Sequence, residues 1–162
     1  IRCAAQGAHI ILMDKNARAL DKVYDQVMAE KSVEPTILEL DAATFSGETA
    51  ELVRRQILDN HGKLDGLVHT ANVSFPLTPI NMVDDEGMNK AFNLLATLPH
   101  RISRELFPVL QQADHASIIF TSHFSAQSHR PFWGYHAGAF AALEALSRQW
   151  ASDTHNLAFS VN

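Results

Sequence analysis

Two histidines stand at the two ends of a loop that joins an expected strand to an expected helix. His123 follows the apolar run Ser117 to Ser122, and His136 lies thirteen residues later, at the start of a helix-forming stretch. A strand, loop and helix of this length can bring two such side chains together. Imidazole has a reference pKa of about 6.5, so either ring suits proton transfer at neutral pH. A shared metal ion is the alternative, but no carboxylate or cysteine accompanies the pair at ligand spacing, so we expect no metal site.

The segments that position these groups alternate between strand and helix. Alternation of this kind predicts an α/β fold with a doubly wound, Rossmann-like parallel sheet and helices on both faces. The sequence has no internal repeat, low-complexity tract or linker, so residues 1–162 are predicted to form a single domain. Strands are expected at Ile10–Met13, Thr36–Leu40, Leu67–His69, Ile118–Thr121 and within Leu157–Asn162. Helices are expected at Asn16–Glu30, Gly47–His61, Asp84–Gln112, which Pro99 should kink or interrupt, and Tyr135–Asp153.

Composition excludes several classes of protein. The chain has 162 residues, 46% of them hydrophobic and 19% charged, and no apolar run of about 18 residues, which predicts a globular protein with no membrane span. A net charge of −5 without any basic cluster argues against nucleic-acid binding. The single cysteine, Cys3, cannot form an internal disulfide, and residues 1–20 lack the pattern of a signal peptide. A cytoplasmic location is therefore predicted.

The segment from Ser117 to Leu146 resembles the active-site region of the short-chain dehydrogenase/reductase (SDR) family. In that family a strand ends in a catalytic serine, and a tyrosine thirteen residues later is followed, at four residues, by a lysine on the same helix. Alignment on the stretch Ala142–Leu146 places His123 at the serine position, His136 at the tyrosine position and Phe140 at the lysine position. If the register slips by one residue, Tyr135 takes the place of the tyrosine, with alanine at the lysine position.

The resemblance implies hydride transfer between NAD(P) and a carbonyl or alcohol, but all four catalytic positions of the family carry other side chains. The fourth, an asparagine of the long helix, falls near Leu95, and Asn93 would lie on a different helical face. Loss of the lysine matters most, because its ammonium lowers the pKa of the tyrosine and binds the nicotinamide ribose. Phe140 can do neither.

On the cofactor side, Asp14 follows the first expected strand. The resemblance implies that this carboxylate accepts hydrogen bonds from the two hydroxyls of the adenosine ribose and would repel a 2′-phosphate. This favours NAD over NADP, although Lys15 beside it weakens the preference. Asp41 matches the family residue that contacts the adenine amine. Both aspartates can equally be turn or N-cap residues, and the sequence leaves the two readings open.

The family's Asn-Asn-Ala-Gly stretch after the fourth strand corresponds here to residues 69–72. Thr70 and Ala71 are the predicted cofactor-binding residues of this stretch. Asn72 puts a side chain where the family uses glycine for a close approach of the backbone.

The resemblance covers only the middle of the family's usual length. Residues 1–7 read as the end of a helix capped by Gly7, with no preceding strand or glycine-rich phosphate loop, and the chain stops within the sixth strand. We therefore expect a sheet without its first strand and C-terminal part. The functions open at this stage are a degenerate pseudoenzyme with little or no turnover, a non-catalytic oligomerisation or interaction subunit, and an active reductase that uses His136 as its acid. The family implies a homo-oligomer formed through the long helix and the Tyr135 helix, and the substrate stays unknown.

Overall fold

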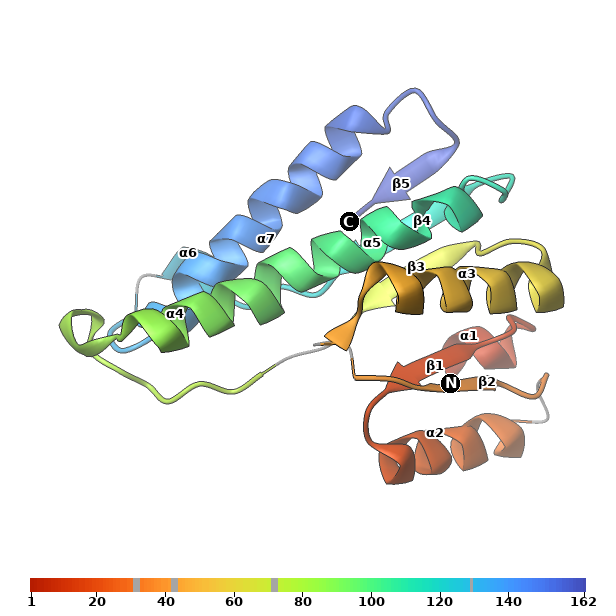
Figure 1. Ribbon diagram of the computed structural model, residues 1–162, viewed down its shortest axis with the longest axis horizontal. Coiled ribbons are helices and arrows are strands. Elements are labelled where there is room, and N and C mark those ends of the chain that lie inside the picture. The colour runs from red at the N-terminus through yellow and green to blue at the C-terminus, as the bar shows by residue number, and fades with distance from the viewer. Residues whose placement is uncertain (31–32, 42–43, 71–72, 129) are drawn as a thin grey trace. The chain divides into compact units, whose positions relative to one another are not determined.

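The computed structural model describes residues 1–30, 33–41, 44–70, 73–128 and 130–162 (Figure 1). The chain divides into two compact units, Ile1–Phe45 and Ser46–Asn162, and each unit contains a sheet of its own. Every pair of neighbouring strands in the named sheets is parallel. The predicted α/β class with parallel strands and intervening helices is thereby confirmed, whereas a single domain stays a prediction. Among the described residues, no helix combines the length and apolar character that crossing a bilayer requires.

The first unit is built around two parallel strands. Its elements are α1 (Arg2–Ala5), β1 (Ile11–Asp14), α2 (Ala17–Ala29) and β2 (Thr36–Glu39). Asn16 starts α2 by accepting a hydrogen bond from the backbone N–H of Ala19, as expected for an N-cap asparagine. Asp14 pairs with Glu39 in the register of the sheet. Parallel pairing therefore brings the carboxyl ends of both strands, with Asp14 and the nearby Asp41, to one edge of this unit.

The second unit has a three-stranded sheet in the order β3, β4, β5, formed by Gly66–His69, Ala116–Phe120 and Phe159–Val161. Side chains of the central strand alternate in burial, because successive residues of a strand point to opposite faces. Ala116, Ile118 and Phe120 are buried in the core of this unit. His123, which follows β4, therefore lies next to the core at the carboxyl end of the sheet.

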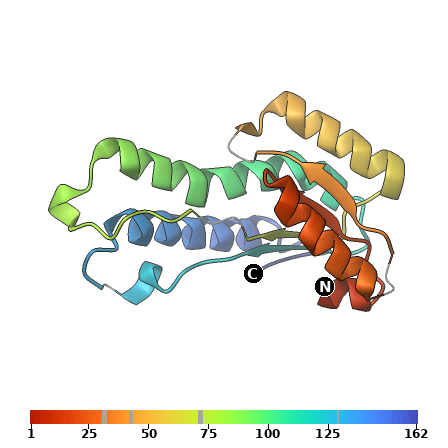
Figure 2. The ribbon, with the colours of Figure 1, turned by 90° about the horizontal axis from the view of Figure 1, so that it is seen from below.

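The helices of the second unit include a long one that is interrupted near Pro99, as the sequence predicts. Proline has no N–H to donate to the carbonyl four residues before it, and a π-helical turn, η3 (Asn93–Thr97), lies at this point. The segment formed by α4 (Asp85–Phe92), η3 and α5 (Leu98–Leu110) runs alongside α7 (Gly134–Asp153) in both views (Figures 1 and 2). The remaining helices of this unit are α3 (Gly47–His61), η2 (Ile80–Met82) and the short α6 (Ser125–Ser128).

Candidate functional site

The loop after β4 and the first turn of α7 bring the two predicted histidines together. The ring centres of His123 and His136 lie 6.4 Å apart. The prediction that the strand, loop and helix place these side chains near each other thus holds. The chemistry open to the pair depends on which ring nitrogens carry protons.

The backbone fixes the tautomer of His136. The N–H of Phe75 donates to Nε2 of His136 over 3.4 Å, so Nε2 is the unprotonated nitrogen and Nδ1 carries the hydrogen. His136 is only 6% exposed, and its Nδ1 is buried without a hydrogen-bond partner among the described residues. Burial lowers the pKa of His136, and the neighbouring His123 lowers it further. The ring is therefore neutral at pH 7.

His123 is held in the other tautomer by Ser125. The backbone N–H of Ser125 donates to Nδ1 of His123 over 3.2 Å, and the Ser125 hydroxyl lies 3.0 Å from the same nitrogen. Because a backbone N–H can only donate, Nδ1 of His123 is the acceptor, and Nε2 is the ring nitrogen that carries hydrogen. Ser125 itself is 2% exposed, so it serves to orient the histidine and is not an accessible nucleophile.

Aromatic rings surround the two imidazoles. The ring of Trp133 lies 4.8 Å from that of His123 and 5.0 Å from that of His136, measured between centres. Phe75 meets His136 edge to face at 5.7 Å, and Phe124 lies 4.1 Å from His123. Trp133 thus forms a wall beside both imidazoles.

Phe132, the residue before Trp133, has a backbone conformation in the left-handed region. It is 53% exposed and has a φ of +70°, a conformation that side chains other than glycine seldom adopt. Its carbonyl accepts a hydrogen bond from the N–H of Thr78 over 2.8 Å, which ties this strained residue to the loop before η2. Holding Phe132 in this conformation positions the adjacent Trp133 against the histidines.

Phe140, at the position that the resemblance gives to lysine, belongs to the hydrophobic core. It is 3% exposed, and its ring lies 5.7 Å from that of His123. An ammonium at this position would be surrounded by apolar side chains. The local environment is therefore adapted to an aromatic ring.

Tyr135 makes a structural hydrogen bond with Asp84. Its hydroxyl donates to the carboxylate of Asp84 over 2.6 Å, and the same carboxylate caps α4 by accepting from the N–H of Gly87. The hydrogen bond to Asp84 raises the pKa of Tyr135 and lowers the pKa of Asp84. A Cβ added at Gly87 would lie 2.6 Å from the tyrosine ring, so the ring is closely packed. The raised pKa makes this phenol a poorer acid than free tyrosine.

We expect Tyr135→Phe to lower the midpoint of thermal unfolding by roughly 3 °C, because it removes a hydrogen bond and keeps the ring. Calorimetry of the variant beside wild type would measure this change. Tyr24→Phe is the matched control, since Tyr24 donates to Glu34 on the surface of the first unit and should leave the midpoint nearly unchanged. An equal effect of both substitutions would contradict a structural role specific to Tyr135.

The family's asparagine position carries no replacement polar group. Leu95 is 2% exposed within the core, whereas Asn93 is exposed at the first residue of the π-helical turn. The two residues thus differ in environment, as the helical spacing predicts.

The predicted cofactor residues lie in two units: Asp14 and Asp41 belong to the first and Thr70 to the second. Asp14 is exposed at the end of β1, where its carboxylate accepts from the N–H of Asn16 over 2.9 Å. Lys15 pairs with Asp41, with 3.6 Å between ammonium and carboxylate. In the second unit Thr70 is exposed just after β3. Ala71 and Asn72 lie outside the described residues.

A buried pair that sequence reasoning missed lies next to this region. Nε2 of His69, the last residue of β3, is 2.8 Å from the hydroxyl of Ser103 on α5, and its ring stacks on Phe120 at 5.0 Å. Burial lowers the pKa of His69 to about 4. The sequence offers one signal for His69, its position at the carboxyl end of a strand. Its pairing with Ser103 could not be predicted, because Ser103 lies far away in the sequence.

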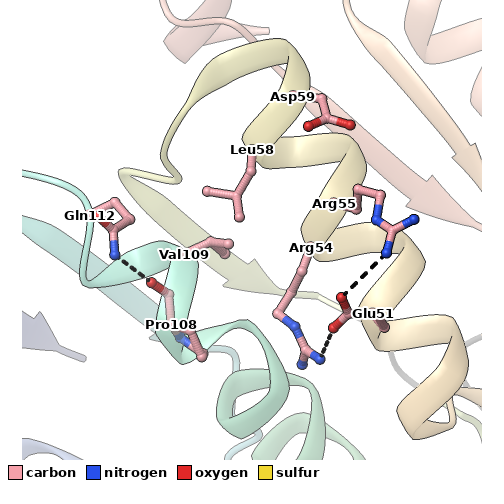
Figure 3. Close-up of a pocket in the computed structure, with 8 residues that line it drawn as sticks. All are labelled: Glu51, Arg54, Arg55, Leu58, Asp59, Pro108, Val109 and Gln112. Atoms are coloured by element: carbon pink, nitrogen blue, oxygen red, sulfur yellow. Dashed lines mark hydrogen bonds and ion pairs between the residues drawn. The ribbon is translucent and has the colours of Figure 1, made fainter.

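A separate hollow of about 530 Å³ lies on the outside of α3 and α5 (Figure 3). Arg54 pairs with Glu51 and with Glu105, and Arg55 pairs with Glu51. The hollow contains none of the predicted site residues, and its charges tie α3 to α5. The lining residues are Glu51, Arg54, Arg55, Leu58, Asp59, Pro108, Val109 and Gln112.

Comparison with known proteins gives consistent matches. The family model described as enoyl-(acyl carrier protein) reductase matches residues 1–162. The uncharacterized oxidoreductase YciK of Escherichia coli K12 is 25% identical over 150 residues, which are 93% of this chain and 60% of that protein.

Solved structures match the whole fold. A short-chain dehydrogenase structure from Pseudomonas syringae superposes with a TM-score of 0.92 at 27% identity, over 98% of this chain and 65% of the other. Another, from Escherichia coli CFT073 in complex with NADPH, gives 0.89 at 25% identity over 99% and 69%. The chain thus spans about two thirds or less of the length of these relatives. With a family model that matches from the first residue to the last, the chain belongs to the short-chain dehydrogenase/reductase family.

Proposed function

We propose that this chain is an SDR-family protein that keeps the adenosine side of a nicotinamide-cofactor site and has lost the catalytic side, so that it transfers hydride slowly or not at all. The observation that carries the proposal is the neutral, buried His136 beside Phe140. The family's tyrosine acid depends on a neighbouring cation that lowers its pKa; here the neutral imidazole of His136 has no acidic proton to give at pH 7, and Phe140 provides no cation.

The residues fit a nicotinamide cofactor only in part. The exposed carboxylate of Asp14 can accept from the hydroxyls of an adenosine ribose and would repel a 2′-phosphate, while the ammonium of Lys15 is paired with Asp41. This supports a preference for NAD over NADP, although a related structure was solved with NADPH. On the nicotinamide side, Phe140 offers no donor for the ribose. Self-association through the long helical segment α4–η3–α5 and through α7 stays a prediction, as does a cytoplasmic location.

The proposal is tested by titrating the protein with NADH and NADPH and by following nicotinamide oxidation with a panel of aldehydes and ketones. Bound nucleotide should stabilise the fold, by about 2.7 kcal/mol at a hundred times its Kd. Asp14→Ala should weaken NADH binding. We expect oxidation rates no higher than those of His136→Phe. The proposal fails if wild type oxidises either nucleotide and His136→Phe does not, since His136 would then be a working acid.

A further inference from the structure

One hydrogen bond between side chains ties α5 to the last turns of α7. The indole N–H of Trp150 on α7 donates to Nδ1 of His100 on α5 over 3.1 Å, and the two ring centres lie 5.9 Å apart. Both residues are half-buried. Among the side chains that the structure describes, no second hydrogen bond or ion pair joins α5 to α7. The polar attachment between these two helices therefore depends on this pair.

The hydrogen bond requires a neutral imidazole at His100. An indole N–H can donate but offers no lone pair to accept with, so Nδ1 of His100 is unprotonated and Nε2 carries the hydrogen. A protonated imidazole has an N–H on both nitrogens and would turn a second donor toward Trp150. The contact therefore forms with one charge state of His100 and is incompatible with the other.

The surroundings of His100 favour the neutral form at pH 7. Burial lowers the pKa of His100, and the positive charge of Arg104, one turn further along α5, lowers it further. The guanidinium of Arg104 is paired with Glu105 over 2.6 Å. On α7 the indole that contacts His100 is uncharged, and Asp153, the nearest charged residue beyond it, does not contribute to the shift. His100 therefore binds a proton only at a pH below the ordinary histidine value.

Trp150 connects this contact to the end of α7 and to the strand that follows. Its ring lies 5.6 Å from the ring of Phe107, which in turn lies 5.5 Å from that of Phe159 on β5. Thr154, at the C-terminal end of α7, donates from its hydroxyl to the carbonyl of Trp150 over 2.8 Å. A change in the bond to α5 would therefore reach the turn between α7 and β5.

We propose that His100 and Trp150 form a pH-sensitive switch between α5 and α7. Neutral His100 holds the last turns of α7 against α5. When the imidazole takes up a proton from solvent, both partners are donors and the hydrogen bond breaks, so the end of α7 and β5 open locally more often. The switch involves no nucleotide, and its failure would be distinct from failure of the proposed function.

The test follows the indole N–H signals of the full chain, labelled with nitrogen-15 in its tryptophans and histidines, from pH 8 to pH 5. The chain has two tryptophans, and Trp133→Phe identifies the signal of each. As the pH falls, the indole proton of Trp150 should move upfield and exchange faster with water, with the same midpoint as the imidazole nitrogens of His100. A Trp150 signal that stays constant, or a His100 that stays neutral throughout this range, would overturn the proposal. Neither result needs a variant to fold.

His100→Asn is the matched variant, because its amide oxygen can accept from the indole without titrating. Between pH 7 and pH 5, the amides of the last turn of α7 and of β5 should lose roughly fivefold more protection against hydrogen exchange in wild type than in this variant, the worth of one hydrogen bond. His9→Asn, the same substitution at an exposed histidine of the first unit, should behave as wild type. His69 is present in all three proteins, so its own titration cancels in the comparison. Equal loss of protection in wild type and His100→Asn would contradict the switch.

Discussion

Replacing Phe140 with lysine, the residue that the family uses at this position, is expected to lower the free energy of unfolding by about 3–5 kcal/mol. The substitution removes a 3%-exposed ring from the core and puts an ammonium among apolar side chains. Urea denaturation at pH 7 measures the loss. The expectation is that simple reversion to the family residue damages the fold and restores no activity.

The pH dependence separates loss of packing from burial of charge. Burial lowers the pKa of a lysine, so the unfolded state binds more protons than the folded state and stability rises with pH. The loss of unfolding free energy caused by Phe140→Lys should therefore become smaller between pH 7 and pH 10. Phe140→Leu, which loses packing only, should cost about 1 kcal/mol at every pH. A lysine variant as stable as wild type would show that this position can hold a cation, and would remove the main argument against catalysis.

A second large effect is expected from His69. Burial lowers the pKa of His69 to about 4, whereas the unfolded chain has the ordinary value near 6.5. The contribution of neutral His69 to the free energy of unfolding is fully present above pH 6.5 and is lost as the pH falls toward 4. In this range the unfolded state binds a proton at His69 and the folded state does not. At pH 5 the loss amounts to about 2 kcal/mol.

His69→Asn tests this assignment by removing the titrating group while keeping a polar side chain opposite Ser103. Between pH 7 and pH 5, the free energy of unfolding of His69→Asn should fall by about 2 kcal/mol less than that of wild type. His115→Asn, the same substitution at an exposed histidine, is the control. Parallel pH curves for wild type and His69→Asn would show that His69 titrates normally in the folded protein.

The elements of the fold could be predicted where local signals define them. The helix Gly47–His61 was predicted with its observed bounds, because Ser46 caps its start and Gly62, at a φ of +72°, ends it. The interruption at Pro99 was predicted from the missing N–H. Its π-helical form was not, since a proline specifies where the hydrogen-bond ladder breaks and not how the next turn closes.

The candidate site was predictable only in part, for a similar reason. His123 and His136 were paired correctly, because a short connection between a strand and a helix limits how far apart they can be. The bond from Tyr135 to Asp84 spans 51 residues, and the pair of His69 with Ser103 spans 34. No local pattern reports such contacts. The tautomers of His123 and His136 could not be predicted either, because they depend on backbone N–H groups that are brought into position only when the loops fold.

The most direct test of the central claim, that the catalytic side of this family site no longer transfers hydride, is to look for the transferred atom. The protein would be incubated with NADPH or NADH carrying deuterium at the transferable position and with mixed aldehydes and ketones, and the alcohols analysed by mass spectrometry. We expect no deuterated alcohol above the level formed in buffer. Deuterated alcohol that forms with wild type and disappears in His136→Phe would contradict the claim.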